Sequence, residues 1–407
     1  MNSNLNHLQP YPFQKLRKLF DGVTRNTALA AIDLHIGEPK HATPDFIRQA
    51  VIDHLDGLAN YPTTQGTLRL RQSIADWIMR RFHIPAINPD TEVIPVNGSR
   101  EALFSFAQTV IDTSATEKPF VVCPNPFYQI YEGAALLAGA LPQFINTTPE
   151  NNFRLDFAQL PDDIWSRTQL VYVCTPNNPT GGVMTLDEWR RLFELSDRHG
   201  FVIAADECYS EIYFDENKPP LGALDAAQQL GRAGFPRLVV FNSLSKRSNV
   251  PGLRSGFVAG DAQILGKYLL YRTYHGCAMN PASQAASTAA WNDETHVMEN
   301  RRMYLEKFSK VTAMLAEPSP QQSATVNMPD AGFYLWYKTP VSDTEFTRLL
   351  HRDYNVTVLP GSYLGREFQG INPGENYVRI ALVATLAECI EAGNRIKSLL
   401  ENLADSH

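Results

Sequence analysis

Residues 238–257 read LVVFNSLSKRSNVPGLRSGF, a short apolar run that passes directly into a polar cluster around Lys246. Amphipathic stretches such as residues 186–199 separate several similar apolar runs, which lie at residues 93–96, 120–123, 170–174 and 201–205. Continuous apolar strands that alternate with helices are typical of a mostly parallel sheet covered on both faces. We therefore predict an α/β fold in which helices sandwich a mostly parallel central sheet. A further run at residues 256–259 predicts one more strand, whose direction the sequence leaves open.

The regions on either side of these strands differ from them in pattern. Helices are expected, in chain order, over residues 13–20, 44–57, 68–82, 186–199 and 386–403. After about residue 285, a long helical pattern through Arg301 and new strand-like runs predict a smaller α+β domain. We predict three segments: an N-terminal arm with part of the small domain (1–45), a large domain (46–285) and the rest of the small domain (286–407).

Composition narrows the function classes. The 407 residues are 44% hydrophobic and carry a net charge of −7, which excludes a disordered chain and provides no positive field for nucleic acid or anionic membranes. Five scattered cysteines without a C-x-x-C pair, and no H-E-x-x-H motif, argue against a disulfide framework and a metal site. No signal-peptide core or apolar stretch of ~18 residues is present. We expect a cytoplasmic protein that binds small molecules.

Each central strand is followed at once by an unusual polar cluster. Because ligands bind at the carboxyl ends of parallel strands, these clusters are expected to converge on one crevice. The clusters are NGSRE (97–101), PNPFYQIY (124–131), TPNNPTGG (175–182), DECYSE (206–211) and NSLSKRS (242–248).

Lys246 is the most informative residue of these clusters. A lysine alone in a polar loop is usually just solvated, but Ser243, Ser245 and Arg254 surround this one in sequence. Two hydroxyls and a guanidinium suit an anchored phosphate, and the amine could then form a Schiff base with an aldehyde of the same cofactor. Pyridoxal 5'-phosphate meets this requirement.

Asp206 closes the most apolar strand and fits the same cofactor. For Asp206 alone, a structural role as a strand-end cap is an equally good explanation. A buried carboxylate would also keep a pyridine nitrogen protonated. Tyr209 and Asn178 could both hydrogen-bond the ring oxygen, although the Asn-Pro and Gly-Gly pairs around Asn178 also satisfy an ordinary turn.

Two further clusters have both a structural and a functional interpretation. Gly98 and Ser99 open an apolar helix; Ser99 suits a simple helix cap, and the free amides there also suit a phosphate. Tyr128 and Tyr131 follow another strand, where aromatic residues usually pack, but one of them could stack on a pyridine ring.

Together these motifs resemble the fold-type I, class I/II pyridoxal-phosphate aminotransferases. The lysine in SLSKRSNVPGLRSGF, the aspartate in AADECY, the NPTG turn, the NGSREAL loop and YVRIAL (377–382) occur in that family's order. The resemblance spans residues 37–379. It implies that Lys246 is the Schiff-base lysine, that Asp206 pairs with the ring nitrogen and that Asn178 and Tyr209 hold the ring oxygen.

The resemblance also assigns the remaining site residues. Tyr128 would stack on the ring, and the phosphate would be held by Gly98, Ser99, the amide of Arg100, Ser243, Ser245 and Arg254. Arg379 matches the arginine that binds the substrate α-carboxylate, and Gly37 matches a loop that faces it. Tyr61 resembles a tyrosine that reaches a neighbouring subunit's phosphate, which implies a homodimer with shared active sites.

Three segments resemble one subgroup, the proteobacterial succinyldiaminopimelate aminotransferases: LQPYPFQKLRKLF, HIGEPKHATP and SLSKRSNVPGLRSGFVAGD. That resemblance implies amino transfer between glutamate and N-succinyl-2-amino-6-ketopimelate, in lysine biosynthesis. A distal substrate carboxylate would need a cation, for which Lys40 is the candidate, although a solvated lysine explains it too. Arg100 departs from the commoner shorter residue, which leaves open whether its side chain contacts phosphate.

Several alternatives use the same residues. An aspartate, aromatic or acetylornithine aminotransferase, or a carbon-sulfur β-lyase, would need the same cofactor site, because the cofactor performs the bond chemistry. A ligand-sensing regulator with an aminotransferase-like domain would need a DNA-reading module, for which the residues before Gly37 are too few.

Overall fold

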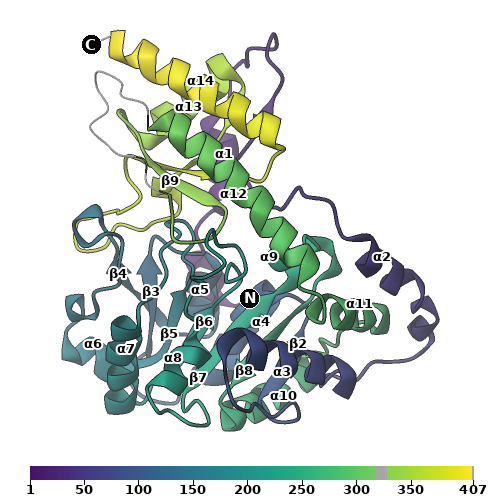
Figure 1. Cartoon of the computed structure of the whole chain (residues 1–407). Coiled ribbons are helices and arrows are strands. Elements are labelled where there is room, and N and C mark those ends of the chain that lie inside the picture. Colours follow the sequence, from purple (N-terminus) through teal and green to yellow (C-terminus); the bar gives the residue numbers. More distant parts are fainter. Residues whose placement is uncertain (317–325, 327, 406–407) are drawn as a thin grey trace.

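A seven-stranded sheet forms the centre of the computed structural model, which describes residues 1–316, 326 and 328–405 (Figure 1). Strands β3 to β7 pair in parallel in the order β7-β6-β5-β3-β4, and β8 joins β7 to β2 with antiparallel pairing on both sides. The predicted mostly parallel sheet is therefore confirmed. Its strands are β2 (Val93–Val96), β3 (Phe120–Asn125), β4 (Leu141–Asn146), β5 (Thr168–Cys174), β6 (Val202–Asp206), β7 (Leu238–Ser243) and β8 (Gly256–Gly260).

Strand β4 was not expected from the sequence. It pairs with β3 alone and begins Leu141-Pro142-Gln143, with Leu141 37% exposed. An edge strand needs no continuous apolar run, because part of it stays in contact with water. The signal used for the central strands is therefore missing here.

Helices cover both faces of the sheet because successive strand residues point to opposite sides. In β3, Val121 enters one apolar core and Val122 the other. One core is formed with α4 (Ser99–Val110), α5 (Ile130–Leu137) and α10 (Ala262–His275). The opposite core is formed with α3 (Leu68–Phe82), α6 (Asp162–Arg167), α7 (Leu186–His199), α8 (Ala223–Gln229) and α11 (Pro281–Trp291).

Local signals explain where these helices begin and end. Thr185 and Glu188 form a capping box at the start of α7, and Gly200, with φ +82°, ends it in the left-handed conformation that glycine favours. The helix expected over residues 44–57 is shorter: α2 covers Asp45–Ile52 and a 3-10 turn follows at Leu55–Ala59. Leu55 and Leu58 are 47% and 61% exposed, so little burial favours a longer helix.

A second, smaller body lies above the large sheet in Figure 1. Its antiparallel sheet has the order β11-β12-β9, and a two-stranded pair joins β1 to β10. Its strands are β1 (Ile32–Asp33), β9 (Tyr334–Lys338), β10 (Val356–Thr357), β11 (Leu359–Pro360) and β12 (Tyr377–Ala381). The β1–β10 pair brings the N-terminal segment beside the C-terminal one, whereas the domain boundaries at 45 and 285 stay predictions.

Two segments connect the small body with the large one. Helix α12 (Thr295–Leu315) runs from the large body into the small one, where α13 (Asp343–Tyr354) and α14 (Leu386–Asp405) pack (Figure 1). The N-terminal helix α1 (Pro12–Leu19) docks through Leu16 against Leu359 and Leu364. Within the described ranges, no helix has both the length and the apolar character needed to cross a membrane.

Candidate active site

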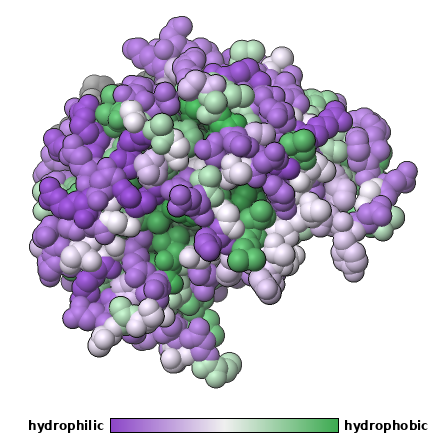
Figure 2. Space-filling model, turned by 90° about the horizontal axis from the view of Figure 1, so that it is seen from below, coloured by the Kyte–Doolittle hydropathy of each residue, from purple (hydrophilic) through white to green (hydrophobic). Residues whose placement is uncertain are grey.

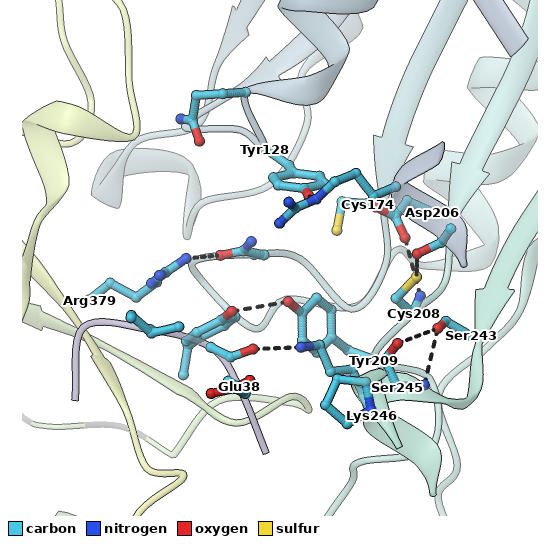
Figure 3. Close-up of a pocket in the computed structure, with 18 of the residues that line it drawn as sticks. Glu38, Tyr128, Cys174, Asp206, Cys208, Tyr209, Ser243, Ser245, Lys246 and Arg379 are labelled. Carbon is cyan, nitrogen blue, oxygen red and sulfur yellow. Dashed lines mark hydrogen bonds between the residues drawn. The ribbon is translucent and has the colours of Figure 1, made fainter. Parts of the chain in front are cut away.

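The polar clusters meet, as the topology requires, at the carboxyl edge of the parallel strands. They surround a cavity of about 650 Å³ between the sheet and the small body (Figure 3). Of the residues singled out from the sequence, those that line it are Gly37, Ser99, Arg100, Tyr128, Asn178, Asp206, Tyr209, Ser243, Ser245, Lys246, Arg254 and Arg379.

Lys246 lies on the short helix α9 (Leu244–Arg247), directly after β7. Its Nζ donates a hydrogen bond to the carbonyl oxygen of Gly37 at 2.5 Å. Burial lowers the pKa of Lys246 to about 8, so a much larger fraction of this amine is neutral near neutral pH than of an ordinary lysine. A neutral amine can attack a carbonyl and accept a proton.

Asp206 is 4% exposed at the end of β6. It accepts hydrogen bonds from the Tyr131 hydroxyl at 2.7 Å and from the Cys208 amide at 3.3 Å. Burial raises the pKa of Asp206, and these hydrogen bonds oppose that rise. A carboxylate buried in this way is stabilised by a cationic partner, which a protonated ring nitrogen supplies.

The start of α4 forms an anion cradle on one side of the cavity. Gly98 has φ +87°, and a Cβ at this position would overlap the guanidinium of Arg254. Ser243 Oγ accepts from the Ser245 amide at 3.1 Å and donates to Ser245 Oγ at 2.9 Å, which fixes both hydroxyls. Free amides at a helix N-terminus, hydroxyls and a guanidinium together suit a phosphate.

Arg379, on β12, is 4% exposed on the opposite side of the cavity. Its Nη1 donates to Asn178 Oδ1 at 3.0 Å and its Nη2 donates to the His35 carbonyl at 2.9 Å. The buried Nε has no partner among the described residues. A carboxylate from a ligand would supply an acceptor for it.

The comparisons with known proteins agree with this chemistry. The family model of class I and II aminotransferases matches residues 30–396. The chain belongs to this family. LL-Diaminopimelate aminotransferase of Aquifex aeolicus is 31% identical over 98% of both chains, and that of Nitratidesulfovibrio vulgaris is 32% identical over 96% of this chain and 97% of its own.

Solved aminotransferase structures show the same fold. An aminotransferase from Neisseria meningitidis is 52% identical, with a TM-score of 0.93, and covers 98% of this chain and all of its own. The aminotransferase AspB from Helicobacter pylori is 36% identical, with a TM-score of 0.88, over 97% of this chain and 99% of its own. The fold-type I aminotransferase prediction is confirmed, and this aminotransferase depends on pyridoxal phosphate, as its family does.

The cavity of this aminotransferase fits that cofactor. The cradle of α4 and Arg254 accommodates a phosphate, the buried Asp206 carboxylate a ring nitrogen, and the Lys246 amine an aldehyde. Tyr128 and Cys208 both line the cavity, so an aromatic ring and a thiol are available beside the cofactor ring (Figure 3). The residues present are therefore chemically sufficient to hold pyridoxal phosphate.

Lys40 and Tyr61, like Gly98 and Tyr131, are not among the residues that line the cavity. Lys40 forms an ion pair with Glu38 at 2.7 Å and lines a separate cavity with His41 and Arg48. Glu38 itself lines the aminotransferase cavity. Lys40 therefore contacts a residue of the catalytic cavity without lining it, and its role toward a distal substrate carboxylate stays a prediction. Tyr61 is fully exposed.

Sequence reasoning missed several residues that shape the site. Tyr131, considered as a ring-stacking residue, is a hydrogen-bond donor to Asp206. The arm residues Tyr11 and Phe13 line the cavity, as does Tyr334, whose ring lies 4.3 Å from the Arg379 guanidinium. Tyr131 stands in a cluster that the sequence analysis identified, and Tyr11 and Phe13 in a segment quoted there, but no local pattern indicates these contacts, which arise from the tertiary fold.

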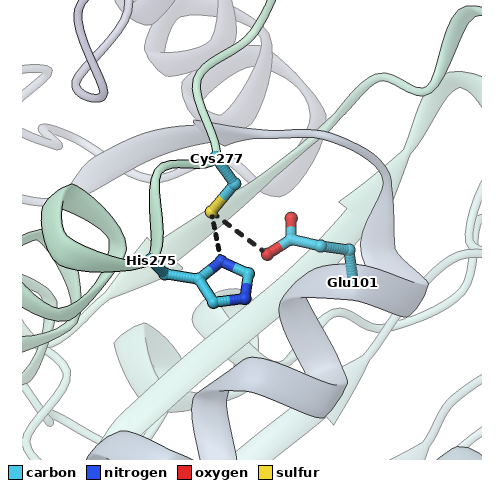
Figure 4. Close-up of side chains that lie close together, drawn as sticks. All are labelled: Glu101, His275 and Cys277. Atoms are coloured by element: carbon cyan, nitrogen blue, oxygen red, sulfur yellow. Dashed lines mark hydrogen bonds between the residues drawn. The ribbon is translucent and has the colours of Figure 1, made fainter.

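A separate cluster of Glu101, His275 and Cys277 has the side chains that metals prefer (Figure 4). Arg272 already donates to Glu101 Oε1 at 2.7 Å and to the Cys277 carbonyl at 3.2 Å. A metal ion bound at this cluster would be repelled by the positive charge of Arg272. The contacts fasten the first turn of α4, which presents Ser99 and Arg100 to the cavity, to α10.

Gly98→Ala tests the cradle. We expect it to lower the free energy of unfolding by ~1–3 kcal/mol, because φ +87° with ψ 152° is a backbone conformation essentially restricted to glycine, and to weaken retention of pyridoxal phosphate by displacing Arg254. Urea unfolding and dialysis against buffer measure the two effects. Gly200→Ala is the matched control: its φ is +82° with open space around it, so only stability should fall. Equal cofactor retention in both variants would contradict the cradle.

Proposed function

We propose that this aminotransferase exchanges an amino group between glutamate and N-succinyl-2-amino-6-ketopimelate. The observation that carries the proposal is the arrangement of Lys246, Arg379 and Arg100 around one cavity. These provide a reactive amine and two guanidinium groups, as a substrate with a carboxylate at each end requires. The relatives named LL-diaminopimelate aminotransferases support a substrate with the diaminopimelate carbon chain.

The cofactor supplies the electron-withdrawing chemistry: when bound, pyridoxal phosphate offers an aldehyde for the amino group and a ring that accepts electrons from the substrate Cα. Asp206 holds the proton on the ring nitrogen, and Tyr209 and Asn178 hydrogen-bond the ring oxygen. Lys246 accepts the proton from the substrate Cα and returns it to the cofactor side, a task suited to an amine with a pKa of about 8.

Arg379 binds the α-carboxylate that both substrates share. Its fork presents two donors in one plane, and contacts with Asn178 and His35 fix its orientation. The substrate Cα is thereby held between Arg379 and Lys246. Both half-reactions use this contact, so specificity must arise at the other end of the cavity.

Arg100 takes the distal role for which the sequence suggested Lys40. It lies on the first turn of α4, and its Nε donates to the Tyr128 hydroxyl at 2.6 Å. Gln129 and the arm residues Tyr11 and Phe13 complete this part of the cavity. The other guanidinium donors of Arg100 suit the terminal carboxylate of the succinyl group.

The second candidate substrate is unacylated LL-diaminopimelate, which the printed names of the relatives favour. Its distal ammonium would need an anion, and Glu38 lines the cavity. Lys40 already compensates that charge at 2.7 Å, whereas a succinylated substrate carries a neutral amide at this nitrogen. The ion pair therefore favours the succinylated substrate.

An assay with glutamate and each acceptor separates the two candidates. We expect Arg100→Gln to lower kcat/KM for the succinylated acceptor ~10–100-fold, because a distal charge contact is lost. The kcat/KM for a neutral amino acid should change less than about threefold. Glu38→Gln should damage only use of the unacylated substrate. If the wild-type enzyme turns over the unacylated acceptor alone, the succinylated assignment is wrong.

Asp206→Asn tests the role of the buried carboxylate. We expect a folded protein with a kcat lower by ~10²–10⁴-fold, because the ring nitrogen loses a buried charge contact of ~3–5 kcal/mol. Tyr131→Phe is the matched control, since it removes one hydrogen bond to Asp206 and keeps the charge. If kcat of Asp206→Asn falls less than tenfold, Asp206 is only a strand-end cap and does not support the cofactor ring.

We also propose a homodimer with shared active sites. Tyr61 is fully exposed, and Leu58, Leu270 and Tyr274 are also largely exposed apolar residues. Figure 2 shows hydrophobic side chains reaching the surface on the face seen from below. Such exposure is typical of a surface that another chain covers.

Hybrids of one weakened and one inactive variant test the shared site. Tyr61→Phe should bind pyridoxal phosphate less tightly, and Lys246→Ala should be inactive. In a mixed dimer, the site with an intact Lys246 is completed by Tyr61 of the inactive chain, so activity above that of either parent is expected. Mixed dimers shown by mass spectrometry that have no added activity would count against sharing.

A further inference from the structure

A chain of hydrogen bonds leads from a buried lysine outside the cavity to the main chain of Lys246. Lys307 Nζ contacts His41 Nε2 at 2.6 Å, and His41 Nδ1 contacts Asn300 Oδ1 at 2.7 Å. Asn300 Nδ2 then donates to the carbonyl oxygen of Lys246 at 3.2 Å. Asn300 is fully buried and Lys307 is 3% exposed, whereas His41 between them is half-buried. We call this set of contacts the His41 chain.

The donors and acceptors of the His41 chain all agree in direction. A lysine ammonium can only donate, so His41 Nε2 is the acceptor and His41 Nδ1 carries the proton that Asn300 Oδ1 accepts. Asn249 Nδ2 donates to the same oxygen at 3.0 Å, which leaves the Asn300 amide group oriented toward Lys246. One tautomer of His41 therefore satisfies every contact.

The His41 chain joins the loop that follows β1 to helix α12, and both segments run between the two bodies of the molecule. Asn300 and Lys307 lie seven residues apart on one face of α12, and His41 ends the loop that leaves β1. Lys307 also donates to the Val383 carbonyl at 3.4 Å in the small body. The His41 chain consequently holds the loop that follows β1 and helix α12 together beside α9.

The loop of residues 35–41 touches both groups that must engage one substrate. The His35 carbonyl accepts from Arg379 and the Gly37 carbonyl accepts from Lys246. The position of this short loop thus sets the separation between the carboxylate-binding guanidinium and the proton-transferring amine. Displacements of ~1 Å in such a separation can cost ~100-fold in rate.

We infer that His41, Asn300 and Lys307 are positioning residues, which fix the loop of residues 35–41 against α12 and thereby set Lys246 relative to the substrate bound at Arg379. The inference rests on the proposed roles of these two residues. None of the three positioning residues lines the catalytic cavity, so they act through the loop and through the Lys246 main chain.

His41→Phe tests the inference, because it removes both hydrogen bonds and retains a ring against Tyr304, whose centroid lies 4.5 Å away. In hydrogen–deuterium exchange of the cofactor-free protein, we expect exchange in the peptide of residues 35–43 to rise about fivefold or more. With cofactor and glutamate, kcat should fall about tenfold or more while KM changes less than threefold.

His296→Phe is the matched control. His296 is also a half-buried histidine on α12 with two hydrogen bonds, to Asp293 and Ser248, but neither partner belongs to the loop. This variant should leave exchange in residues 35–43 unchanged. His41→Asn, whose amide can still donate to Asn300, should restore most of the protection and of kcat.

Each outcome decides the inference. Unchanged exchange in residues 35–43 of His41→Phe, or an equal rise across the whole protein, overturns it, because the role is then absent or merely structural. If His41→Phe does not fold, hydrogen–deuterium exchange is measured on Lys307→Met instead, with the same rise expected in residues 35–43. A wild-type protein without aminotransferase activity would refute the proposed function, and the cofactor-free exchange data would still decide whether the chain holds the loop.

Discussion

Burial of both faces of the seven-stranded sheet is the constraint on which the rest of the structure depends. Since α3, α7 and α11 cover one face and α4, α5 and α10 the other, polar side chains on the strands are tolerated only at their ends. The parallel strands all end at the same edge. The small body lies over this edge, so the polar residues are collected in one cavity whose innermost groups, such as Asp206 and Arg379, are withdrawn from water.

That withdrawal from water accounts for the unusual acid–base properties of the site. Burial lowers the pKa of Lys246 and raises that of Asp206, so both charged forms are disfavoured in the protein alone. A ligand with complementary charges relieves both penalties when it binds. The same groups that make the cavity reactive therefore reduce the stability of the protein in the absence of cofactor.

The sequence predicted the central sheet well because its signals are local. The expected helices over residues 68–82 and 186–199 match α3 and α7, whose apolar faces and caps lie within the segments themselves. The edge strand β4 has no continuous apolar run, and α2 ends early because the residues beyond it bury little surface. The polar clusters were predicted to converge because parallel strands end at one edge of a sheet, and in the structure they do meet at that edge. Tyr131, Glu38 and the His41 chain were missed, because their partners are distant in sequence and no spacing links His41 to Asn300 and Lys307.

The N-terminal arm, docked through α1, allows substrate recognition and catalytic chemistry to change independently during evolution. Residues that perform the chemistry lie at strand ends, where movement of one backbone disturbs its neighbours. Tyr11 and Phe13 instead reach the cavity from α1, which is held mainly by the seat of Leu16 on Leu359 and Leu364. Substitutions in the arm can thus reshape the recognition end of the cavity while the sheet and its reactive groups stay intact. Divergence of substrate range within one conserved chemistry is the expected consequence.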